Sequence, residues 1–85
     1  MNVEFARSAR RSLQELPAPR RRQIVARIEA FATRPTSREF DVRPLAGSDL
    51  YRLRVGSYRV LMTIDRGSDR IVVKLIRSRG DVYKR

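Results

Sequence analysis

The sequence predicts an α+β fold of two layers, in which an N-terminal strand and an antiparallel helix hairpin pack on a mostly antiparallel, curved sheet of four or five strands. Apolar residues follow helical spacing before residue 34 and strand alternation after residue 49. Turns that contain Gly join the last three strand segments, as expected for consecutive hairpins. Because the chain has 85 residues and shows no linker or repeat, we expect a single domain over residues 1–85.

A short strand and two helices are expected in the N-terminal half. Asn2–Phe5 alternates apolar and polar residues, as a strand does. The next apolar residues recur at helical spacing, at Ala6, Ala9, Leu13 and Leu16. Pro17 and Pro19 end this helix, because proline lacks a backbone donor. A second helix is expected from about Pro19 to Thr33, and the short link predicts that the two helices are antiparallel neighbours.

A loop over Arg34–Phe40 is expected to lead into an antiparallel meander. Pro44 favours a sheet edge for a short strand over Asp41–Leu45. Three more strands are predicted at Leu50–Val55, Tyr58–Asp65 and Arg70–Arg77. In the last of them, alternation places Ile71, Val73 and Leu75 on one face and Val72, Lys74 and Ile76 on the other.

Alternation also predicts one apolar and one basic face for the first hairpin of the meander. The face that the helices are expected to cover holds Tyr51, Leu53, Val55, Tyr58, Val60, Met62 and Ile64. Arg52 and Arg54 fall on the opposite, open face, and Arg59 joins them from across the turn. Because like charges side by side repel each other, these three arginines predict an anionic ligand on the open face.

Composition limits the partners and the chemistry. The formal net charge is +11, and of the twenty basic residues only Lys74 and Lys84 are lysine. Nucleic acid is therefore the first expected partner and an acidic protein the second. The absence of Cys and His removes disulfides, thiolate metal sites and the commonest general base, and we expect neither a metal nor a cofactor. Without a membrane-spanning run or a signal peptide, the chain is expected in the cytoplasm.

Two motifs in the C-terminal half are more specific. The first reads L-x-G-S-x-x-Y-R-L-R-V-G-x-Y-R-V from Leu45 to Val60, and the second, R-x-D-V-Y, ends the segment Arg77–Tyr83. Together with the strand, helix pair and loop that precede them, they resemble the RelE-like toxins of bacterial and archaeal toxin–antitoxin modules, in the RelE/ParE superfamily. The resemblance implies the toxin component of a type II module.

The resemblance further implies a ribosome-dependent mRNA endoribonuclease that needs no metal. In this reaction a 2′-hydroxyl attacks the neighbouring phosphate, giving a 2′,3′-cyclic phosphate and a 5′-hydroxyl. The functional positions of the family match Arg52, Arg54, Arg59, Arg79 and Tyr83. Guanidinium groups would stabilise the charge of the transition state. Tyr83 is the best candidate for the general base, and Arg79 is favoured for charge stabilisation because arginine rarely releases a proton.

Two departures from the family pattern restrict the mechanism. Well-known members carry lysine at the positions of Arg52 and Arg54, and many carry histidine at the position of Ser78. A lysine or histidine base at these positions is therefore excluded in this chain.

Other readings of the sequence stay open. A ParE-like toxin of the same fold would inhibit DNA gyrase, and a degenerate member would bind antitoxin and operator DNA without cutting RNA. Each candidate site residue also has a simpler interpretation. Arg52 and Arg54 would be solvated charges on an open sheet face, and Arg59 would form a surface ion pair with Asp65 or Asp49. Tyr83 would only pack its ring at the chain end. Arg20, Arg21 and Arg22 would form either a solvated helix face or a site for ribosomal RNA phosphate.

The partners implied by the charge and the resemblance are all macromolecules. They are an acidic antitoxin, mRNA in the ribosomal A site together with ribosomal RNA, and operator DNA bound through the antitoxin complex. No membrane contact is expected.

Overall fold

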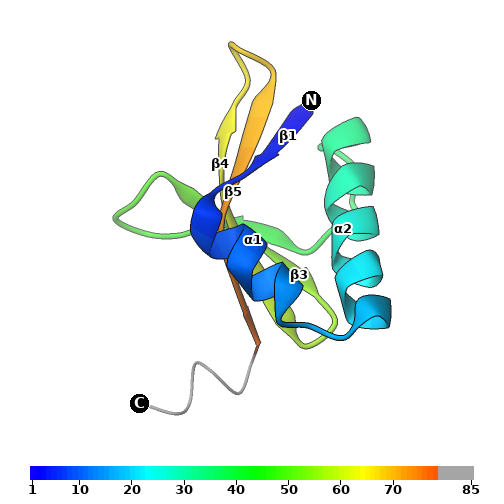
Figure 1. Ribbon diagram of the computed structural model, residues 1–85. Helices are drawn as coiled ribbons and strands as arrows, with labels where there is room; N and C mark the ends of the chain where they lie inside the picture. The colour runs from blue at the N-terminus through cyan, green and yellow to red at the C-terminus, as the bar shows by residue number, and fades with distance from the viewer. Residues whose placement is uncertain (79–85) are drawn as a thin grey trace.

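The structure, a computed structural model, describes residues 1–78 and contains two helices and one five-stranded sheet. The elements in chain order are β1 (Asn2–Phe5), α1 (Arg7–Gln14), α2 (Ala18–Thr33), β2 (Val42–Pro44), β3 (Leu50–Val55), β4 (Tyr58–Asp65) and β5 (Arg70–Ser78). The strand order is β1-β5-β4-β3-β2, in which β1 is parallel to β5 and all other pairs are antiparallel (Figure 1). The predicted α+β class and mostly antiparallel sheet are confirmed.

Most predicted strand bounds agree with the structure. β1, β3 and β4 have the predicted ends, whereas β5 extends one residue further and β2 is two residues shorter than expected. Pro44 ends β2, since proline cannot donate to the ladder and is confined to sheet edges. The turn from β3 to β4 relies on Gly56, whose φ of 59° suits glycine at the first position of a tight hairpin.

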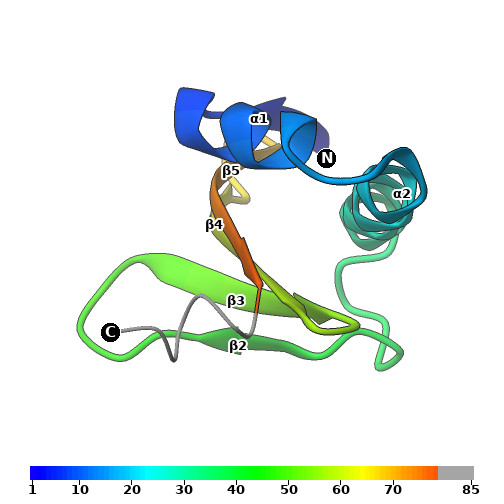
Figure 2. The same cartoon turned by 60° about the horizontal axis from the view of Figure 1, so that its bottom comes forward.

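The two helices are joined by a short link and lie on one side of the sheet (Figures 1 and 2). Arg21 at the start of α2 donates hydrogen bonds of 3.4 Å to the carbonyls of Leu13 and Leu16 at the end of α1. Of the three consecutive arginines, only Arg20 and Arg22 are therefore exposed, whereas Arg21 ties the helices together.

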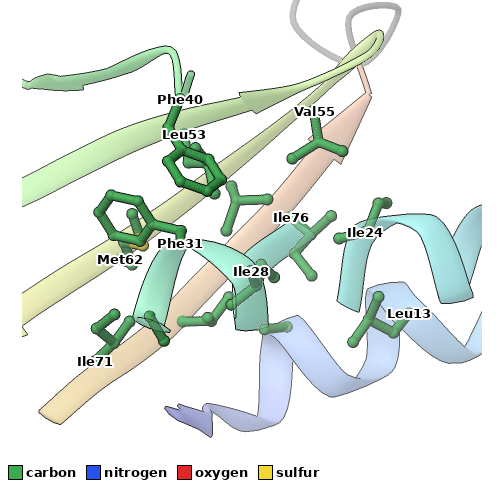
Figure 3. Packing of buried hydrophobic residues seen from close by; sticks show 14 residues of the cluster. Leu13, Ile24, Ile28, Phe31, Phe40, Leu53, Val55, Met62, Ile71 and Ile76 are labelled. Carbon is green, nitrogen blue, oxygen red and sulfur yellow. The ribbon is translucent and has the colours of Figure 1, made fainter. Parts of the chain in front are cut away.

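The hydrophobic core lies between the helices and the covered face of the sheet. Its largest fully buried side chains are Ile24, Ile28, Phe31, Leu53, Val60, Met62, Ile71 and Val73 (Figure 3). Tyr51, Tyr58 and Ile64 are half-buried at its edge, as expected for the covered face. Among residues 1–78, no helix is long and apolar enough to cross a membrane.

A β-bulge between β4 and β5 changes which residues of β5 face the core. Leu61 pairs with Leu75, but the next residue, Met62, pairs with Val73, so Lys74 is an extra residue without a partner in β4. The expected alternation is therefore wrong beyond Val73: Ile76 is buried in the core, and Leu75 lies on the open face. The same shift turns Arg77 to the open face, which is where the functional site is assembled.

Candidate functional site

Three arginines form a row across three neighbouring strands on the open face. Arg54 of β3 is paired with Arg59 of β4, and Arg59 is paired with Arg77 of β5. Side chains directly opposite each other on one face of a sheet have Cβ atoms about 5 Å apart, and like charges in such positions are destabilising. We call these three residues the arginine row. An anion bound over the row would remove this repulsion.

A small cavity lies beside the row on the same face. Its volume is about 160 Å³, and it is lined by Leu45, Arg52, Arg59, Leu61 and Arg77. This space is large enough for several water molecules, and three of its five lining residues are arginine. The structure thus brings together the predicted residues Arg52 and Arg59 and adds Arg77, which the sequence reasoning missed.

The arginines differ in whether a carboxylate accompanies them. Arg52 donates from Nη2 to Asp41 Oδ1 at 2.9 Å, and Arg54 Nε lies 3.8 Å from Asp41 Oδ2. Arg43 also approaches the same carboxylate, with 3.8 Å between its Nε and Asp41 Oδ1. Arg52 is largely buried, with 16% of its side chain exposed, whereas Arg54 is 49% exposed. Arg52 and Arg54 therefore lie on the open face as predicted, but not simply as solvated charges.

Arg59 and Arg77 have no carboxylate within 4.0 Å among the residues that the structure describes. The expected alternative of a pair between Arg59 and Asp65 or Asp49 does not form. Asp65 ends β4 and accepts a hydrogen bond of 3.2 Å from the Ser68 backbone N–H. Hydrogen bonds from Ser68 lower the pKa of this carboxyl, so it belongs to the turn before β5. Arg59 and Arg77 are thus the described cations of the cavity that are available to a ligand.

Asp41 is held in place from two directions. Its backbone carbonyl accepts a hydrogen bond of 2.9 Å from the Arg54 backbone N–H, which continues the β2–β3 ladder. The preceding residue, Phe40, is buried and makes an edge-to-face contact with Phe31 of α2, with ring centroids 5.4 Å apart. Arg27 of α2 stacks over the Phe40 ring, 4.4 Å from its centroid.

The loop before Asp41 is fixed to α2 through Glu39. Arg27 donates to the Glu39 backbone carbonyl at 2.8 Å, and Arg34 Nη2 lies 2.9 Å from its carboxylate. The hydrogen bond from Ser37, followed by the charges and hydrogen bond of the two arginines, lowers the pKa of Glu39. The position of Asp41 relative to the arginine row is therefore set by the core and by α2.

The cavity has the charge to bind an anion, but the described residues that line it supply no group for proton transfer. The described side chains that line it are arginine and leucine, and arginine stays protonated in proteins. Two of the predicted site residues, Arg79 and Tyr83, lie outside the described residues. Within residues 1–78, no group of three acidic side chains is placed to hold a metal ion.

The comparison with known proteins decides the family. The model of the family described as "ParE toxin of type II toxin-antitoxin system, parDE" matches residues 3–83. The chain belongs to the RelE/ParE family of toxins. The resemblance to RelE-like toxins that the sequence motifs predicted is thereby confirmed.

This RelE-like toxin has relatives in archaea and bacteria. It is 33% identical over 85 residues to a protein named as toxin RelE1 of Methanocaldococcus jannaschii, an alignment that covers 98% of this chain and 94% of the relative. It is 38% identical over 89 residues to toxin RelG of Mycobacterium tuberculosis, covering 98% and 95% of the two chains. Among solved structures, the RelE–RelB complex of Pyrococcus horikoshii contains a chain that superposes with a TM-score of 0.78 at 29% identity, covering 93% of this chain and 94% of that one.

Proposed function

We propose that this toxin is a ribosome-dependent endoribonuclease that cleaves mRNA in the A site. The observation that supports this function best is the arginine row beside an open-face cavity, with Arg59 and Arg77 unpaired among the described residues. Such an arrangement suits a phosphate group that gains negative charge during a reaction, because donors already in place need no reorganisation.

In the proposed reaction the ribose 2′-oxygen attacks the adjacent phosphorus, and the bond from phosphorus to the 5′-oxygen breaks. The products are a 2′,3′-cyclic phosphate and a 5′-hydroxyl. Arg59 and Arg77 hold the non-bridging phosphate oxygens and stabilise the extra charge. One group must accept the 2′-proton and another must donate a proton to the leaving 5′-oxygen. Tyr83 is the proposed base and Arg79 a further charge-stabilising residue, both assigned from the family resemblance.

The proposed partners follow from charge and from the relatives. The solved RelE of Pyrococcus horikoshii is in complex with RelB, and the present chain carries a net charge of +11. We therefore expect an acidic antitoxin that covers the open face, where a charged segment can fold on binding. Ribosomal RNA beside the A site, operator DNA bound through the toxin–antitoxin complex and a cytoplasmic location belong to the same proposal.

The test is cleavage of mRNA on programmed ribosomes. Purified toxin is incubated with ribosomes that hold a defined codon in the A site, and the ends of the mRNA are mapped and chemically typed. The proposal expects cuts within the A-site codon that leave 2′,3′-cyclic phosphate and 5′-hydroxyl ends, with and without a metal chelator. Intact mRNA after incubation with folded toxin would refute it.

A gyrase inhibitor is the second candidate function, and two observations favour it. The described lining of the cavity contains no side chain that titrates near neutral pH, and the matching family model is named for ParE. DNA supercoiling by gyrase should therefore be measured with the same toxin preparation. Inhibition of supercoiling without mRNA cleavage would favour this function, whereas absence of both activities would indicate a degenerate member that binds only antitoxin and operator DNA.

A further inference from the structure

Asp41 stands at one end of the arginine row. The β2–β3 ladder continues through the hydrogen bond from the Arg54 N–H to the Asp41 carbonyl. Successive neighbours across the sheet are therefore Asp41, Arg54, Arg59 and Arg77. The row therefore has an internal anion at its β2 end. At its β5 end, no carboxylate within residues 1–78 comes within 4.0 Å of the guanidinium of Arg59 or of Arg77.

We infer that Asp41 is a positioning residue that engages Arg52 and Arg54, so that the phosphate of a bound nucleic acid is directed to Arg59 and Arg77. The inference rests on the proposed function only in taking RNA as the ligand. It divides the basic face into two parts: one in which the Asp41 carboxylate offsets part of the charge of Arg52 and Arg54, and one left for the ligand.

The contacts of Asp41 support this division. Its carboxylate accepts from Arg52 at 2.9 Å and has Arg54 at 3.8 Å, so both of its oxygens face arginines that approach from β3. Arg52 is largely buried, and its Nε has no acceptor among the described residues. Because the Asp41 pair is the hydrogen bond that holds this guanidinium, Arg52 cannot turn toward a ligand without losing it.

The anchoring of Asp41 makes its carboxylate a fixed charge. Phe40 is buried against Phe31, and Glu39 is bound to α2 through Arg27 and Arg34. A carboxylate on a free loop could move aside when a phosphate arrives. Asp41 instead stays beside Arg52 and Arg54, and it repels a phosphate from the β2 end of the row.

Salt dependence of RNA binding distinguishes the two parts. The logarithm of the binding constant falls linearly with the logarithm of the salt concentration, and each phosphate contact on a single strand adds about 0.7 to the magnitude of this fall, here called the slope. The probe is a short single-stranded RNA in which every 2′-hydroxyl is methylated. This RNA cannot be cleaved, so a failure of ribosomal cleavage would refute the proposed function and leave the binding measurement intact. Arg54 and Arg59 form a matched pair of variants, because they lie opposite each other in the sheet. Of the two, Arg54 has the Asp41 carboxylate nearby, at 3.8 Å.

We expect removal of both Arg59 and Arg77 to lower the slope by about 0.7, the value for one phosphate contact, and each single Ala variant to give part of this change. Arg54→Ala should leave the slope nearly unchanged. Asp41→Asn should raise the slope by about 0.7, because Arg54 becomes available to a second phosphate. In the Asp41→Asn background, Arg54→Ala should then return the slope to the parent value. The control is Glu29→Gln on α2, which changes the net charge by the same amount and makes no ion pair among the described residues.

Three results would overturn the inference. The first is that Arg54→Ala and Arg59→Ala lower the slope equally in the parent protein. The second is that the salt slope of RNA binding is no larger for Asp41→Asn than for Glu29→Gln. The third is that the folded parent toxin does not bind the RNA at all. Asparagine keeps an oxygen that can accept from Arg52, and the comparison of Arg54 with Arg59 remains decisive even if the Asp41 variant unfolds.

Discussion

Arg59 on β4 lies directly opposite Arg77 on β5, on the face of the sheet that the helices leave open. This pairing depends on the bulge at Lys74, because an uninterrupted strand would place Arg77 on the same face as Ile71 and Val73, which are buried in the core. A single extra residue in β5 therefore decides whether the cavity has two or three guanidinium groups along its wall. The residues that line the cavity are thus determined by the register between β4 and β5.

The register of β5 can be tested by truncating two adjacent apolar residues. Ile76 is 5% exposed and belongs to the core, whereas Leu75 is only half-buried on the open face. Ile76→Ala should lower the free energy of unfolding by about 2–5 kcal/mol, the usual effect for a buried aliphatic side chain. Leu75→Ala should have a clearly smaller effect. Urea unfolding of both variants measures the difference, and a larger loss for Leu75→Ala would mean that the strand has no bulge.

Glu39 should contribute to the acid limb of the stability curve. Its pKa in the folded protein is lowered, first by the hydrogen bond from Ser37 and then by Arg34 and Arg27. Because the folded pKa lies below the unfolded one, this contribution is complete above the unfolded pKa of about 4.3 and is lost as the pH falls through the folded pKa.

Glu39→Gln should accordingly flatten the loss of stability on the acid side of pH 5, and Glu29→Gln should leave that limb as it is in the parent. Thermal unfolding followed by circular dichroism at several pH values between about 3 and 7 provides the measurement, over the range in which carboxyl groups titrate. An acid limb of the same steepness in Glu39→Gln and in the parent would show that this carboxyl does not anchor the loop before Asp41.

Tyr83→Phe tests the proposed general base, since it keeps the ring and removes only the hydroxyl. If Tyr83 accepts the 2′-proton, the single-turnover rate of mRNA cleavage should fall on the scale of about 10²–10⁴-fold that general acid–base catalysis contributes. Affinity for the ribosome should stay nearly unchanged. A Tyr83→Phe toxin as fast as the parent would exclude proton transfer by this residue and leave charge stabilisation and orientation of the 2′-hydroxyl as the means of catalysis.

Much of the fold could be predicted from the sequence, because its signals are local. The ends of β1, β3 and β4 follow from alternation and from turn residues such as Gly56, and the basic face of β3 follows from Arg52 and Arg54. Strand alternation fixes the facing of each residue as long as the pairing is regular. These predictions needed no knowledge of contacts between distant segments.

The remaining part of the site could not be predicted because it depends on pairing between strands. Arg77 reaches the open face only through the bulge at Lys74, whose trace in the sequence is the adjacent apolar pair Leu75 and Ile76. Asp41 meets Arg52 because β2 and β3 pair in a particular register, which the sequence of either strand alone does not reveal. Arg79 and Tyr83 stay predictions, since they lie outside the residues that the structure describes.

The most direct test of the central claim compares Arg77→Ala with Arg43→Ala in mRNA cleavage on programmed ribosomes. Both variants lose one guanidinium from the sheet, but Arg43 is 76% exposed on the edge strand and is absent from the lining of the cavity. We predict that Arg77→Ala slows cleavage by about 10²–10³-fold, the scale for losing one preorganised donor at a developing charge. Arg43→Ala should remain close to the parent rate. Equal rates for Arg77→Ala and the parent would contradict the claim that the bulge in β5 completes the phosphate-binding site.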